Sequence, residues 1–151
     1  MIEHLKDLFA YEAWANERCI RASESIYATD EPMRRLLSHV INAHGVWLAR
    51  IEKRNSVHGI WDIHEHNTLL TIDQTNNREW LSYLDSIDDR QLEQAINYSD
   101  ASGTPWSTPL LDIVQQILNH STYHRGQIAA RISSLGFSPL PTDYIMFSRM
   151  K

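Results

Sequence analysis

Apolar residues recur at intervals of three and four positions through four long stretches of the chain. This is the period of an amphipathic α-helix, in which one face is buried and the other meets solvent. The stretches cover approximately residues 2–27, 32–54, 71–87 and 109–136. Each is long for a helix in a small protein, and together they predict an all-α fold.

Local signals mark the ends of these stretches. Thr-Asp-Glu-Pro at 29–32 combines a helix cap with an early-turn proline, and Thr71–Gln74 is a capping-box pattern. Thr108 followed by Pro109 predicts a cap and a first-turn proline for the last helix. Gly136 is placed to stop it.

The connections complete the expected architecture. Residues 55–67 are polar, have no clear period and are read as a long connection, while residues 95–110 suggest a short hairpin or an irregular loop. We therefore expect a single domain spanning residues 1–151, a four-helix bundle with long connections between its second and third and its third and fourth helices.

Composition narrows the class of protein. The chain has 151 residues, a formal net charge of −5 and 22% charged residues, which does not favour nucleic-acid binding. Its single cysteine, Cys19, excludes an internal disulfide and is expected to be a buried apolar residue. No membrane span or signal peptide is evident, so we expect a cytoplasmic protein without a membrane partner.

The most informative chemical feature is His120–Ser121–Thr122–Tyr123–His124 in the last helical stretch. Residues four apart stand one turn above each other on a helix, so two imidazoles at this spacing can bind one transition metal. His124 falls within the apolar stripe of its helix and His120 on its flank. Buried histidines without partners would cost about 1–3 kcal/mol each, which a shared metal would offset.

A third ligand has two candidates on the second helical stretch, His39 at the edge of the apolar stripe and His44 near its centre. The residues alone leave this choice open. Histidines at 58, 64 and 66 fall in a connection and His4 on the surface. The alternative to a metal site is a set of hydrogen-bonded structural histidines. No ExxH, HExxH, P-loop or GxGxxG pattern is present, so a di-iron carboxylate site, a zincin and a phosphate-cradling loop are not supported.

Four blocks in order along the chain resemble the DinB (damage-inducible) family of the DinB/YfiT-like metalloenzyme superfamily. They are YEAWAN at 11–16, LSH followed by WLAR within 37–50, NHSTYHRGQI at 119–128 and PTDY at 141–144. The resemblance implies an up-down-down-up four-helix bundle with a three-histidine metal site. By motif position the ligands are His39, His120 and His124, with His44 as the alternative to His39.

The resemblance also implies zinc or nickel as the metal and a low-molecular-weight thiol as substrate, since related members act on such thiols. Three histidines with an open position are typical of a catalytic metal. We therefore expect a thiol-dependent transferase or hydrolase, acting as a homodimer. The alternatives are a non-catalytic metal-binding stress-response protein and a helical interaction module with structural histidines.

The residues after His124 allow several interpretations. Arg125 points about 100° away from it and is expected to bind a second subunit, an anionic substrate or a surface carboxylate. Gly126 suggests close helix packing, because glycine inside a helix costs up to about 1 kcal/mol relative to alanine. Gln127 is expected either to hydrogen-bond behind a ligand or to face solvent.

Overall fold

The computed structural model describes all residues from Met1 to Lys151 and is mostly helical, with one small two-stranded sheet. The elements, in chain order, are α1 (Ile2–Ser23), α2 (Glu31–Ile51), α3 (His66–Asp85), the short 3-10 helix η1 (Gln91–Glu93), β1 (Ala95–Ser99), β2 (Pro105–Pro109), α4 (Leu110–Ser134) and α5 (Tyr144–Ser148). The sheet departs from the all-α expectation. No helix is long and apolar enough to cross a membrane.

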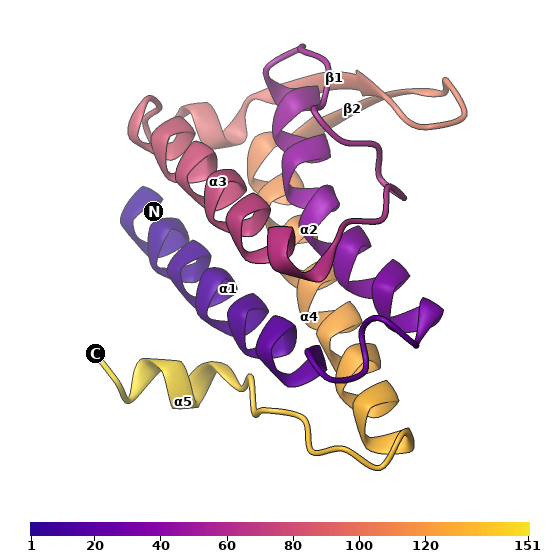
Figure 1. Ribbon diagram of the computed structural model, residues 1–151. Coiled ribbons are helices and arrows are strands. Elements are labelled where there is room, and N and C mark those ends of the chain that lie inside the picture. Colours follow the sequence, from indigo (N-terminus) through magenta and orange to yellow (C-terminus); the bar gives the residue numbers. More distant parts are fainter.

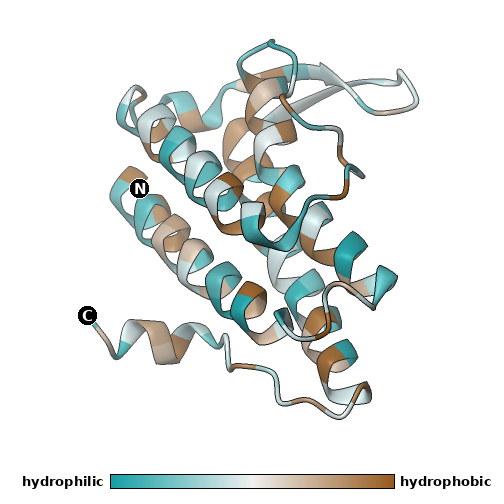
Figure 2. Cartoon of the chain, in the orientation of Figure 1, coloured by the Kyte–Doolittle hydropathy of each residue, from teal (hydrophilic) through white to brown (hydrophobic).

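The four long helices pack side by side (Figure 1). Helices α1 and α2 each pack mainly against α3 and α4, so α1 and α2 lie diagonally opposite one another. The hairpin of β1 and β2 lies at one end of the helices, and α5 runs along the outer side of α1. Each long helix carries both hydrophobic and hydrophilic residues along its length, as an amphipathic helix should (Figure 2).

Two helix ends, the start of α2 and the end of α4, form as the local sequence patterns predict. The Asp30 side chain accepts a hydrogen bond from the Met33 amide at 2.9 Å, with Pro32 in the first turn of α2. Gly136 adopts a positive φ of 83° just after α4, while the amides of Gly136 and Phe137 donate to the carbonyls of Ser133 and Ile132. This is the Schellman arrangement that a glycine stop favours. Both predictions are confirmed.

Two predicted helix starts are wrong. Helix α3 begins at His66, so the Thr71–Gln74 pattern lies inside it. The first residue of the helix is held by a hydrogen bond of 2.9 Å between Nε2 of His66 and the Ile20 carbonyl. Thr108 lies in β2 instead of capping α4. The amide of Leu110 donates to the Gln94 carbonyl, so pairing from the hairpin replaces the cap.

Other boundaries shift by less. Helix α1 ends at Ser23 and hydrogen-bonded turns follow it, whereas the apolar pattern continued to residue 27. Residues 95–109 form an antiparallel hairpin in which Ala95 pairs with Pro109 and Ser99 with Pro105. The long connections on either side of α3 are present, the first at residues 52–65 and the second containing η1 and the hairpin.

The core consists of two hydrophobic clusters with polar side chains between them. One cluster surrounds Phe9 and Trp80, and the other surrounds Met33 and Ile128. Between them along the helices lie six buried residues, which we call the polar layer: Glu12, Asn16, His44, Asp73, Ser121 and Arg125. Every long helix contributes to this layer, which places a set of buried charges directly behind one face of α4.

Candidate metal centre

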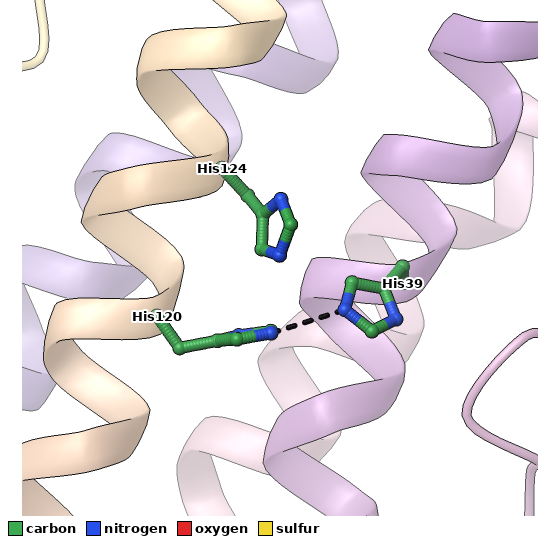
Figure 3. A group of neighbouring side chains, drawn as sticks. All are labelled: His39, His120 and His124. Carbon is green, nitrogen blue, oxygen red and sulfur yellow. Dashed lines mark hydrogen bonds between the residues drawn. The ribbon is translucent and has the colours of Figure 1, made fainter.

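The two histidines of the HxxxH pattern lie one turn apart on α4. Their ring centroids are 4.4 Å apart, and both rings are turned towards α2 (Figure 3). Helical geometry alone accounts for this pair, because side chains at i and i+4 share a face. The sequence-based interpretation of His120 and His124 as neighbours is confirmed.

His39 reaches the same point from α2. Its Nε2 lies 3.0 Å from Nε2 of His120, and its ring centroid lies 4.9 Å from those of both His120 and His124. One ring nitrogen from each of the three residues lies within 4.8 Å of the other two. Figure 3 shows the three rings converging on the space between α2 and α4.

Hydrogen bonds from Nδ1 orient two of the three rings, those of His39 and His124. The Nδ1–H of His39 donates to the carbonyl of Ile60 at 3.2 Å, and the Nδ1–H of His124 donates to Oε1 of Gln127 at 2.6 Å. Each of these donations makes Nε2 the unprotonated nitrogen of its ring, and that of His39 accepts the hydrogen bond from Nε2–H of His120. Such partners, which fix the tautomer and the direction of the ring, are typical of metal-ligating histidines.

Burial favours the neutral form of His39 and His120. It lowers the pKa of His39 below the ordinary value, an effect that the nearby His124 reinforces. Burial, followed by the charges of His124 and His39, lowers the pKa of His120 to about 4. Neutral imidazoles are the form that binds metal, because protonation occupies the lone pair.

The residues therefore fit a divalent transition metal. Three imidazole nitrogens converge, lone pairs on two rings are directed by hydrogen bonds, and the Nδ1 atom of His120 is buried without a partner. A site with three protein ligands leaves a position for water or a substrate, as in catalytic zinc sites. His39, His120 and His124 are the residues that could hold such an ion.

The remaining histidines lie elsewhere. His44 is buried in the polar layer, where its Nε2 lies 2.9 Å from Oγ of Ser121, and burial lowers its pKa to about 3. It is not part of the three-histidine cluster. Nε2 of His64 lies 2.6 Å from Oδ1 of Asn42, the His66 ring binds the Ile20 carbonyl, and His4 is exposed.

Two expectations about the residues after His124 are wrong. Arg125 is 2% exposed and forms a two-pronged ion pair with Glu12, at 2.7 Å through Nη1 and 2.8 Å through Nη2. The Arg125 side chain therefore points into the core. It follows His124 directly on the helix, and the turn of about 100° between successive residues directs it towards α1. Gly126 packs against nothing: a Cβ there would have no neighbour within 4 Å. Gln127 does hydrogen-bond behind a ligand-type histidine, one of the two alternatives.

Two residues beside His39, Ile60 and Trp61, were not among the site residues predicted from the sequence. The Trp61 indole stacks on the His39 ring with a centroid distance of 4.0 Å and an interplanar angle of 12°. Both residues lie in the connection at 52–65, which has no helical or strand period to orient its side chains. The only signal was the concentration of His and Trp in the segment HGIWDIHEH at 58–66.

The structure thus defines a mostly helical protein with a three-histidine cluster able to hold a metal ion between two of its long helices. The sequence profile of the DinB family matches residues 1–151, the whole chain. The chain belongs to the DinB family, and the resemblance found in the sequence is confirmed.

Two individual proteins illustrate the relationship. Protein DinB of Bacillus subtilis (strain 168) is 32% identical over 57 residues, which are 38% of this chain and 33% of that protein. The match therefore spans only about a third of that relative's length. A crystal structure of a DinB-like protein from Bacillus cereus ATCC 10987 has a TM-score of 0.73 at 18% identity, covering 92% of this chain and 95% of that one. At this level of identity, the similarity to the Bacillus cereus protein shows a shared fold and nothing more.

Proposed function

We propose that this protein is a metal-dependent enzyme whose single ion, zinc or nickel, is held by His39, His120 and His124. The observation that carries the proposal is the convergence of one ring nitrogen from each histidine within 4.8 Å. When bound there, a divalent ion supplies Lewis acidity that favours the thiolate form of a ligating thiol or activates water. We propose a thiol-dependent transferase, with hydrolysis as the second candidate reaction.

The chain's own residues contribute binding and orientation. His39 and His124 present Nε2 because Ile60 and Gln127 accept their Nδ1 protons. The cluster is accessible from its α4 side, because His120 and His124 are only half-buried whereas His39 is buried. A small thiol and its electrophile would therefore approach from the surface between α2 and α4.

The proposal includes the finer architecture expected of this family. The pairing of α1 and of α2 with both α3 and α4 supports a four-helix bundle of the up-down-down-up type. In such a bundle, cofactor sites are built from side chains of facing helices. The pair of histidines on α4 and the single histidine on α2 have that arrangement.

The test begins with metal content. Protein purified without a histidine tag or added metal is expected to carry about one ion per chain, and His124→Ala is expected to carry none. His4→Ala, which removes an exposed histidine outside the cluster, is the matched control and should retain the ion. A metal-free wild-type protein that binds no zinc or nickel on titration would overturn the proposal.

Turnover separates an enzyme from a binding protein. Wild-type protein loaded with zinc or nickel is expected to consume a small thiol together with an alkylating electrophile, and His124→Ala is not. Hydrolysis is assayed on the same samples by omitting the thiol. Stoichiometric metal without either turnover would favour the non-catalytic metal-binding alternative.

A further inference from the structure

The connection at residues 52–65 is held against one face of α2 by polar side chains of that helix. Oγ of Ser38 accepts from the amide of His64 at 3.1 Å. Nδ2 of Asn42 donates to the Asp62 carbonyl at 2.8 Å, and its Oδ1 lies 2.6 Å from Nε2 of His64. A segment with no regular structure is thereby fixed at its later end.

This fixed segment makes two contacts with a single ring, that of His39. The Ile60 carbonyl accepts from Nδ1, and the Trp61 indole lies flat on the imidazole at 4.0 Å. The guanidinium of Arg35, one helical turn before His39, lies 5.4 Å from the centre of the same indole. Trp61 therefore covers two consecutive turns of α2.

Burial does not account for the position of Trp61. Its side chain is 55% exposed, so much of its apolar surface remains in water instead of joining either hydrophobic cluster. Stacking of aromatic rings adds to the stabilisation from buried area and favours one relative orientation. The contact is thus better suited to orienting the His39 ring than to stabilising the fold.

His39 needs such orientation more than the other two histidines. His120 and His124 share one helix, and their separation is set by the helical rise. His39 approaches from a different helix, so rotation of its ring decides whether Nε2 faces the other two. The Ile60 hydrogen bond fixes one edge of the ring, and the Trp61 stack fixes its plane.

We propose that Trp61 is a positioning residue for the metal ligand His39, and that it couples the connection at residues 52–65 to metal affinity. This inference rests on the proposed function, because it assumes that His39 is a ligand. It assigns to an exposed loop tryptophan a role in metal binding that the three-histidine cluster alone does not include.

Cobalt(II) titration of the metal-free protein tests the proposal, with affinity measured by competition with a chelating dye. Trp61→Ala is expected to weaken binding about 10- to 100-fold, the range found when partners behind metal ligands are removed. Trp61→Phe keeps a flat ring and is expected to stay within about threefold of wild type. The matched control is Trp106→Ala, which removes an indole that is 53% exposed on the hairpin and should leave affinity unchanged.

Spectroscopy tests first whether the ion lies near Trp61 and then whether the ligand geometry changes, and a purely structural role would leave the ligand geometry unchanged. Cobalt is expected to quench wild-type tryptophan fluorescence, and Trp61→Phe should lose most of the quenching while Trp106→Phe retains it. The visible cobalt bands of Trp61→Ala should shift, because the ligand ring is no longer held.

Equal affinity and unchanged cobalt bands in Trp61→Ala, with one ion bound to wild type, would overturn this inference alone. Failure of the wild-type protein to bind cobalt, zinc or nickel would overturn the proposed function and this inference together.

Discussion

The three-histidine cluster and the polar layer are one residue apart on α4, yet they use their polar groups in opposite ways. His124 turns towards α2, where one ring nitrogen from each of the three histidines lies within 4.8 Å of the other two. Arg125 turns towards α1 and has Glu12, Asn16 and Thr122 as acceptors within 3.1 Å. The histidine cluster could hold an ion, whereas the polar layer pairs most of its polar groups with one another.

This difference separates residues that bind from residues that hold the fold. Burial lowers the pKa of the Arg125 guanidinium, but the hydrogen bonds and the charge of Glu12 outweigh burial and raise it above the ordinary value. Arg125 is therefore a permanent cation inside the core. A charge in that position is tolerated only while its partner is present.

The largest expected effect comes from breaking this pair. Arg125→Met should lower the free energy of unfolding by about 3–5 kcal/mol, because Glu12 is left buried without a counter-charge. Urea unfolding of metal-free protein measures the change. His124→Ala, at the neighbouring position, should cost at most about 1 kcal/mol, as expected of a half-buried side chain outside the core.

The double variant Glu12→Gln/Arg125→Met sharpens this result. Removing both charges should recover much of the lost stability, since neither remains unpaired. Equal losses in Arg125→Met and His124→Ala would contradict the division between the two regions.

An intermediate effect on stability is expected at Asp73, the residue that α3 contributes to the polar layer. Burial raises the pKa of its carboxyl to about 7; one oxygen accepts from Nδ2 of Asn16 at 2.8 Å, and the other has no partner. Between about pH 4 and pH 7 the folded state holds a proton that the unfolded state has released. Stability from this group therefore falls as the pH rises through that window.

Asp73→Asn removes the titration while keeping an acceptor for Asn16. The stability of the variant relative to wild type should increase from pH 4 to pH 7 by a few kcal/mol, since one pKa unit corresponds to about 1.4 kcal/mol. Urea unfolding of both proteins across this range measures the difference. A difference that stays constant over the range would show that Asp73 is ionised in the folded protein.

The smallest expected effect is at Gly126. A methyl group there meets nothing within 4 Å, so Gly126→Ala should stabilise the protein by about 0.5–1 kcal/mol through helix propensity alone. Gly45→Ala is the matched control, because its Cβ would lie 3.0 Å from Oδ1 of Asn76 and should cancel the gain. Thermal unfolding compares the two. Destabilisation by Gly126→Ala would restore the close-packing interpretation.

The periodicity of the sequence predicted the four long helices and the His120–His124 pair, because both follow from spacing within one helix. The choice between His39 and His44 required knowledge of which face of α2 meets α4. The central position of His44 in the apolar stripe indicated burial, and the structure places it in the polar layer, away from the cluster.

The features that sequence analysis missed depend on contacts between distant segments. Arg125 and Glu12 are 113 positions apart, and no local pattern indicates that a cation beside a histidine points into the core. Trp61 lies in a connection whose conformation is set by Ser38 and Asn42 of α2. The start of α4 depends in the same way on Gln94, which precedes the hairpin.

The separation of Glu12 from Arg125 has a consequence for biosynthesis. The chain is made from its N-terminus, so α1, α2 and α3 are synthesised before α4. Until Arg125 emerges, any closure of those helices would bury the Glu12 carboxylate without its counter-charge. We therefore expect closure of the helices, and with it assembly of the histidine cluster, to await the segment that carries Arg125.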